Sequence, residues 1–167
     1  MKYAIDIAGL KRQLPICRVT DNLYIGAFVM FGDVELTVHC ATELLKRAPE
    51  YDYLIAPEAK SIPLLYEMAR QSGADKYFLA RKGPKAYMSG VFEVRVQSIT
   101  TAGEQTLVID TADAEKMRGK RIVIVDDVIS TGESLRAMEM LINKAGGVIV
   151  GKAAVLAEGD AANRADI

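Results

Sequence analysis

Two adjacent carboxylates, Asp126 and Asp127, stand between an apolar run and a loop of small polar residues. Paired carboxylates suit the hydroxyl groups of a sugar or a hydrated divalent cation such as Mg²⁺. Hydroxyl groups and the unpaired N–H groups at the start of a helix suit a phosphate. The segment therefore predicts a sugar-phosphate site with Asp126 and Asp127 as candidate metal ligands. The loop residues expected to hold the phosphate are Ser130, Thr131, Gly132, Glu133 and Ser134.

A strand is predicted before the acid pair, and a helix is predicted after the loop. Residues 122–125 are apolar and β-branched, which is typical of a strand covered on both faces in a parallel sheet. After the loop, an apolar stripe at helical spacing predicts a helix that ends at Gly146 and Gly147. In open α/β sheets, ligands bind outside the carboxyl ends of the strands. The acid pair and the loop would both lie at such an end.

A plain strand-turn-helix unit is the alternative for this segment. Ser130 and Glu133 fit a capping box, in which each side chain satisfies a backbone N–H of the first helical turn. That alternative does not account for the adjacent carboxylates, so the sugar-phosphate interpretation is favoured. Because the Glu133 carboxylate would repel a phosphate, its side chain is expected to fold back as a helix cap.

Residues 121–135 (RIVIVDDVISTGESL) resemble the phosphoribosyl pyrophosphate signature of the type I phosphoribosyltransferases. The resemblance extends over residues 51–158 and implies an α/β fold with a mostly parallel central sheet and helices on both faces. It also implies a small N-terminal hood, here residues 1–33, and a flexible β-hairpin loop. Residues 1–167 would form a single domain.

A second strand-loop-helix unit is expected over residues 51–71, with a turn that reads Pro-Glu-Ala-Lys-Ser. It resembles the pyrophosphate loop of the adenine-type branch of the family. The resemblance implies that backbone N–H groups of Ala59, Lys60 and Ser61 hold the pyrophosphate. The chain departs from that branch at Ser61, where glycine is usual. The alternative is a surface turn with a solvated lysine.

A basic turn follows the next expected strand, residues 76–80. It is either a solvated turn or a clamp for pyrophosphate, and the resemblance favours the clamp. Arg81 and Lys82 are then pyrophosphate ligands, and Lys85 joins Asp126 and Asp127 as a candidate catalytic residue. Residues 91–110 predict a hairpin with a turn at residues 100–104, which resembles the loop that closes over the reacting centre and excludes water.

The first 33 residues are the hardest to assign. Residues 10–14 suggest a short helix before a proline, and residues 21–22 suggest a turn. Phe28 and Phe31 are candidates to stack on a flat base, with Val128 flanking the same base. The alternative for either aromatic residue is a place in the core or at a dimer interface. A helix is expected over residues 34–47, with its apolar face formed by Val34, Val38, Ala41 and Leu45.

Composition limits the classes of partner. The chain has 167 residues, of which 50% are hydrophobic and 26% charged, and its net charge is −1. These values predict one globular domain and argue against nucleic acid as the main partner, because such proteins usually carry a basic excess. No signal peptide or membrane span is expected, so the predicted location is the cytoplasm. Cys17 and Cys40 are expected to be buried in a reducing compartment.

The resemblance implies transfer of a phosphoribosyl group from phosphoribosyl pyrophosphate to a purine base, with Mg²⁺ as cofactor and a homodimer as the assembly. In the vertebrate hypoxanthine-guanine enzymes an aspartate stands at the position of Ser130, so its absence favours adenine. Enzymes for hypoxanthine or xanthine share a similar signature and remain an alternative. A regulator that senses phosphoribosyl pyrophosphate without catalysis is another, although the cations of the expected pyrophosphate loops favour an enzyme.

Overall fold

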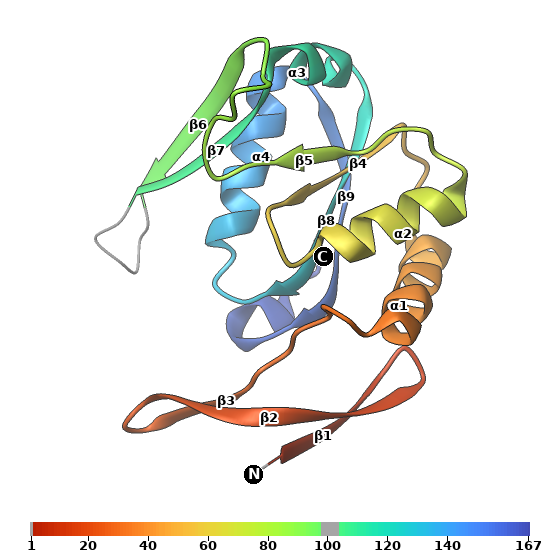
Figure 1. Cartoon of the computed structure of the whole chain (residues 1–167), viewed down its shortest axis with the longest axis vertical. Coiled ribbons are helices and arrows are strands. Elements are labelled where there is room, and N and C mark those ends of the chain that lie inside the picture. The colour runs from red at the N-terminus through yellow and green to blue at the C-terminus, as the bar shows by residue number, and fades with distance from the viewer. Residues whose placement is uncertain (1, 98–103) are drawn as a thin grey trace.

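The structure is a computed structural model that describes residues 2–97 and 104–167. Most of the predicted hairpin turn at residues 100–104 lies outside the described residues. A four-stranded parallel sheet in the order β5-β4-β8-β9 forms the centre of the fold (Figure 1). Its strands are β4 (Tyr53–Pro57), β5 (Phe78–Ala80), β8 (Arg121–Ile129) and β9 (Val148–Ala157). The predicted parallel α/β architecture is confirmed.

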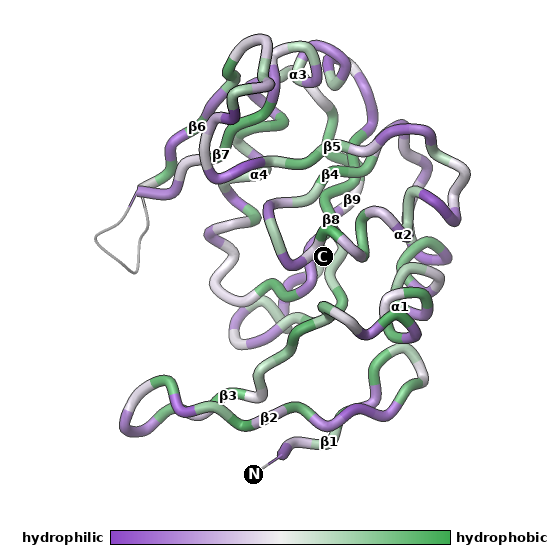
Figure 2. Tube along the Cα trace, in the orientation of Figure 1, coloured by the Kyte–Doolittle hydropathy of each residue, from purple (hydrophilic) through white to green (hydrophobic). Residues whose placement is uncertain are grey.

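Helices cover both faces of this sheet, because β8 is apolar on both sides. Ile122 and Ile124 pack into the core beneath α4 (Glu133–Ala145) and α3 (Thr111–Met117). Val123 and Val125 pack on the opposite face, against α1 (Val34–Arg47) and α2 (Ile62–Ser72). Figure 1 shows the two helical layers on either side of the sheet, and Figure 2 shows hydrophobic residues along its strands. The strand predicted as buried on both faces is therefore confirmed.

A hairpin of β6 (Val91–Gln97) and β7 (Glu104–Asp110) lies beyond the β5 edge of the sheet. Val94 and Val96 point into the core shared with α4, as the alternation in the sequence predicts. Two backbone hydrogen bonds of 2.8 Å between Arg81 and Val108 join the hairpin to the end of β5. The hairpin thus continues the sheet edge next to the basic turn.

The N-terminal region forms a separate antiparallel sheet of β1 (Lys2–Ile7), β2 (Leu10–Thr20) and β3 (Leu23–Gly26). The helix predicted over residues 10–14 is wrong, because these residues pair with β1 from Leu10↔Ile7 to Leu14↔Tyr3. Five residues cannot hold a helix by themselves, whereas the Ala8–Gly9 turn, with positive φ at both residues, closes a tight hairpin. The predicted turn at residues 21–22 is confirmed.

Helix α1 has the predicted bounds, and its predicted apolar face is buried only in part. Its buried residues are Leu36, Thr37, Cys40 and Ala41, whereas the side chain of Val34 is 74% exposed. The helix packs against α2 and the sheet, so its buried face begins at Leu36 and not at Val34, whereas Ala41 is buried as predicted. Cys40 is buried as predicted, but Cys17 is exposed on β2, so that prediction is wrong for Cys17. Among the described residues, no helix is long and apolar enough to cross a membrane.

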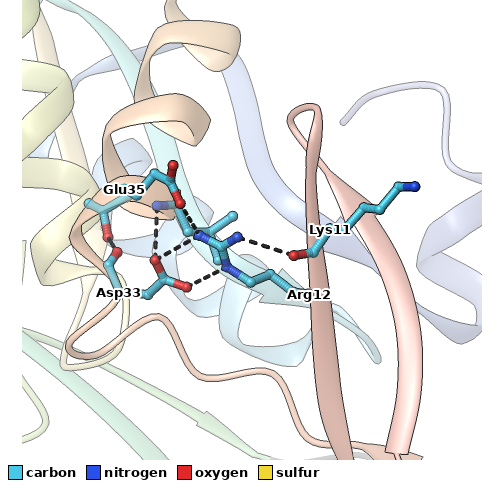
Figure 3. A network of polar contacts seen from close by, with 6 residues as sticks. Lys11, Arg12, Asp33 and Glu35 are labelled. Atoms are coloured by element: carbon cyan, nitrogen blue, oxygen red, sulfur yellow. Dashed lines mark hydrogen bonds and ion pairs between the residues drawn. The ribbon is translucent and has the colours of Figure 1, made fainter.

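Arg12 ties the N-terminal sheet to the start of α1 (Figure 3). Its guanidinium contacts both carboxylate oxygens of Asp33 at 2.7 and 3.0 Å and one oxygen of Glu35 at 2.8 Å. Asp33 is also the N-cap of α1 and accepts a hydrogen bond from the N–H of Leu36 at 3.0 Å. The hydrogen bond from Arg12 is the main cause that holds the pKa of Asp33 below its usual range.

We expect Asp33→Ala to lower the free energy of unfolding by about 1–2 kcal/mol, because it removes a helix cap and a paired carboxylate. Asp33→Asn keeps the helix cap, so its free energy of unfolding should fall less than that of Asp33→Ala at neutral pH. Because the folded-state pKa lies below the unfolded value of about 3.9, the charged pair stabilises the fold above that pH, and its contribution is lost as pH falls through the folded pKa. Urea unfolding across this range tests the prediction. A wild-type advantage over Asp33→Asn that persists below the folded pKa would contradict it.

Candidate functional site

The acid pair lies inside β8, near its carboxyl end. The strand continues to Ile129, so both acids are strand residues and not the first residues after it. The N–H of Asp127 donates to Oδ1 of Asp126 at 2.9 Å. Asp127 is 6% exposed, and its Oδ2 atom is buried with no hydrogen-bond partner in the described residues. A buried carboxylate oxygen without a donor is costly to the fold and indicates a functional role.

Asp126 lines a cavity of about 40 Å³ together with the loop that follows β8. Burial raises the pKa of the Asp126 carboxyl to about 7, and the nearby positive charge of Lys60 acts in the opposite direction. Lys60 belongs to the loop after β4, so its charge reaches the acid pair from the neighbouring strand. The other residues that line the cavity are Val128, Ile129, Ser130, Thr131, Gly132, Ser134 and Leu135.

Gly132 is the N-cap of α4 and has a φ of 79°, a conformation that side chains rarely adopt. The capping box of the alternative interpretation is therefore not formed: Ser130 precedes the cap position, and Gly132 has no side chain to cap the helix. The Thr131 hydroxyl instead accepts from the Glu133 N–H at 3.4 Å. The Ser134 hydroxyl contacts the amide of Gln105 on the hairpin at 3.2 Å. The backbone N–H groups of the first turn thus remain next to the cavity.

The loop after β4 lies at the same edge, because β4 and β8 are parallel neighbours in the sheet. Ala59 and Lys60 are exposed, whereas Ser61 is buried and its hydroxyl donates to the carbonyl of Pro57 at 2.8 Å. Ser61 is also the residue before α2, and its side chain closes the turn without pointing outward. The exposed part of this loop is therefore Ala59 and Lys60.

Glu58 joins this loop to the basic turn. Its carboxylate pairs with Nε of Arg81 at 3.1 Å and accepts from the N–H of Lys82 at 3.1 Å. Arg81 also donates to the Tyr87 hydroxyl at 2.5 Å. The Lys82 N–H and then the Arg81 side chain lower the pKa of Glu58, and the charge of Lys85 adds to this effect. The Arg81 side chain, the Lys82 backbone and the charge of Lys85 thus lie close to the first loop. The sequence analysis missed Glu58, whose only signal was an acid two residues before Lys60 in that loop.

The model of a family described as phosphoribosyl transferase domain matches residues 38–166, which include both loops, the acid pair and the C-terminal segment. The chain belongs to the phosphoribosyltransferase family. An adenine phosphoribosyltransferase of Thermotoga petrophila is 32% identical over 101 residues, which are 60% of this chain and 56% of the relative. An orotate phosphoribosyltransferase of Stenotrophomonas maltophilia is 33% identical over 102 residues, 61% of this chain and 40% of the relative. The matched residues therefore span about half the length of these relatives, 56% of the first and 40% of the second.

A solved phosphoribosyltransferase supports the fold. The adenine phosphoribosyltransferase of Saccharomyces cerevisiae superimposes with a TM-score of 0.71 at 17% identity, over 92% of this chain and 89% of that structure. The family model begins at residue 38, but the superposition leaves only 8% of the chain uncovered. Part of the region before residue 38 is therefore also similar to that structure. The type I phosphoribosyltransferase fold predicted from the signature is confirmed.

The three candidate base-binding residues lie in different surroundings. Val128 is half-buried and lines the cavity beside Asp126. Phe28 is 7% exposed and packs in the core with Met30 and Leu36. Phe31 is 53% exposed. Of the two aromatic residues, Phe31 is the one whose ring is accessible to a ligand.

The C-terminal segment also reaches the loop that follows β8. A short 3-10 helix, η1 (Gly159–Asn163), follows β9. Arg164 comes next, and its Nη1 atom lies 2.9 Å from the position that a Cβ atom on Gly132 would take. No spacing in the sequence connects Arg164 with Gly132, so the sequence alone does not identify Arg164 as a site residue.

Proposed function

We propose that the chain transfers the 5-phosphoribosyl group of phosphoribosyl pyrophosphate to a purine base, adenine being favoured, and releases pyrophosphate. One observation carries the proposal: the phosphate cavity, the acid pair and the Lys60 loop meet at one edge of the sheet. Family membership supports the reaction. The names of relatives such as the Thermotoga petrophila enzyme support adenine.

Each group would act at one part of the substrate. The 5-phosphate binds at residues 130–134. The bond between sugar C1 and the pyrophosphate oxygen breaks, its electron pair stays on pyrophosphate, and a base nitrogen bonds to C1 and loses its proton. Positive charge that develops at C1 is stabilised by Asp126 and Asp127, which also hold the ribose hydroxyls. The backbone of residues 59–61 and the side chains of Arg81, Lys82 and Lys85 bind the leaving pyrophosphate.

Mg²⁺ fits this site only together with the substrate. Among the described residues, no group of three His, Cys, Asp or Glu side chains is placed to hold a metal ion. Mg²⁺ commonly uses one or two carboxylates plus substrate phosphates and waters. Asp126 and the unpartnered Oδ2 of Asp127 match that donor set. The ion would neutralise charge on the leaving pyrophosphate.

The base would lie against Val128, with the exposed ring of Phe31 a candidate to cover it. The buried ring of Phe28 would then support the hood from the core side. We also propose a cytoplasmic homodimer that acts in purine salvage. The relatives' names support the role in purine salvage, and the homodimer is what the resemblance to the family implies.

A pyrophosphate-release assay tests the reaction and the base together. Protein, Mg²⁺ and phosphoribosyl pyrophosphate are mixed separately with adenine, hypoxanthine, guanine, xanthine, uracil and orotate. Orotate belongs in the panel because one similar relative is an orotate enzyme. We expect release with adenine. Release with another base alone would overturn adenine but support the reaction. No release with any base, while phosphoribosyl pyrophosphate still raises Tm, would overturn the enzyme and favour a sensor.

A further inference from the structure

We infer that Arg164 is part of the 5-phosphate site and donates a hydrogen bond to the phosphate from the C-terminal side of the loop. This inference rests on the proposed function, because it concerns the phosphate that residues 130–134 would hold. It adds a residue from a segment 30 positions further along the chain than the loop.

The C-terminal segment is held against the loop by the backbone and the core. Ala157 pairs with Ile129 at the end of the two neighbouring strands β9 and β8. The N–H of Glu158 donates to the carbonyl of Ile129 at 3.0 Å. In η1, Ala161 is 3% exposed and belongs to the core beneath α4. These contacts return the chain to the start of the phosphate loop.

Asp166 orients the guanidinium of Arg164. Its two oxygens accept from Nε at 2.8 Å and from Nη2 at 2.7 Å, in the bidentate geometry typical of arginine and carboxylate. Asp166 is itself held by Lys152 at 2.6 Å, and Lys152 pairs with Glu139 of α4 at 2.5 Å. With one edge of the guanidinium fixed in this way, the remaining atom, Nη1, lies on the side of Gly132.

The position of Nη1 suits a phosphate oxygen. Gly132 lines the cavity of the loop, and a glycine there leaves the space into which Nη1 points. The hydroxyl groups of the loop carry no charge, and the Glu133 carboxylate adds a negative charge to the first turn of α4. A guanidinium keeps its charge at all ordinary pH values and presents directed donors to phosphate oxygens. Arg164 would therefore supply the charged donor that residues 130–134 lack.

Binding of two separate probes distinguishes this role from a general structural one. Titration calorimetry measures the binding of ribose 5-phosphate and of pyrophosphate to the wild type, Arg164→Gln and Arg164→Lys. We expect Arg164→Gln to lower the affinity for ribose 5-phosphate about tenfold or more, and Arg164→Lys to lower it less. Neither variant should change the affinity for pyrophosphate. Arg47→Gln is the matched control: its side chain is 75% exposed on α1, and both affinities should stay at wild-type values.

The outcomes separate this inference from the proposed function. If Arg164→Gln binds ribose 5-phosphate as tightly as the wild type does, the proposed role of Arg164 is overturned. It is also overturned if the variant loses affinity for both probes in parallel and has a lower Tm. If wild type binds neither probe and releases no pyrophosphate with any base, the proposed function fails as well. Asp166→Asn provides a second variant if Arg164→Gln does not fold. It should weaken ribose 5-phosphate alone, because Arg164 loses its orienting partner, and an unchanged affinity would count against the inference.

Discussion

Asp127→Asn is expected to lower kcat/KM by roughly 10²–10³-fold, a loss typical of removing one group that stabilises charge in the transition state. The same change should leave the free energy of unfolding unchanged or raise it. Oδ2 of Asp127 is buried without a hydrogen-bond partner in the described residues, so an ionised carboxylate there destabilises the fold. Asparagine has nearly the same shape and removes that charge. Residues that destabilise the fold are commonly retained where activity needs them.

Steady-state kinetics with phosphoribosyl pyrophosphate and the preferred base give the activity, and urea unfolding gives the stability. Asp75→Asn is the control, because Asp75 is exposed between α2 and β5 and outside the site. It should change neither quantity. Parallel losses of activity and stability in Asp127→Asn would show that the residue acts as a structural group.

Gly132→Ala is expected to raise the KM for phosphoribosyl pyrophosphate more than about tenfold, which corresponds to about 1.4 kcal/mol of binding. An added Cβ would lie 2.9 Å from Nη1 of Arg164 and would fill space inside the cavity. The positive φ of 79° also disfavours alanine by about 1–2 kcal/mol. If the backbone shifts to relieve the contact with Arg164 or the unfavourable φ, the N–H groups of the first turn of α4 move with it.

Gly9→Ala separates the two causes. Gly9 has the same φ of 79°, but an added Cβ would meet no atom within 4 Å. Both variants should lose similar stability in thermal unfolding, whereas only Gly132→Ala should lose affinity for ribose 5-phosphate and phosphoribosyl pyrophosphate. Equal kinetic defects in the two variants would place the effect of Gly132→Ala in global stability and not in the phosphate site.

Residues close together in the sequence were enough to predict the phosphate loop. The apolar run at residues 122–125 specifies a strand covered on both faces, because it has no polar side to expose. The glycines that flank α4 permit the positive φ values at its two ends. Helix and strand periods also predicted α1, α2 and the amphipathic hairpin. These features depend on local periodicity and backbone conformation, which a sequence carries directly.

The N-terminal sheet shows where local patterns fail. Residues 10–14 contain too few residues to choose between helix and strand by themselves. Pairing with β1 and the Arg12–Asp33 contact decide the outcome, and both involve residues outside that segment. The buried face of α1 was predicted only in part for a related reason, since the surface that it packs against belongs to α2 and the sheet.

The sequence by itself determined the acid pair and the two candidate anion loops, because each is encoded within about fifteen consecutive residues. The parallel α/β fold followed from the strand-loop-helix units that recur over residues 51–158. Only the tertiary structure decided how these parts meet. Sheet order brings Lys60 to Asp126, Glu58 connects the first loop to the basic turn, and the return of the chain after β9 brings Arg164 to Gly132. Such contacts join residues far apart in the chain, and their charges and donors reach one another only after the sheet has formed and the helices have packed on it.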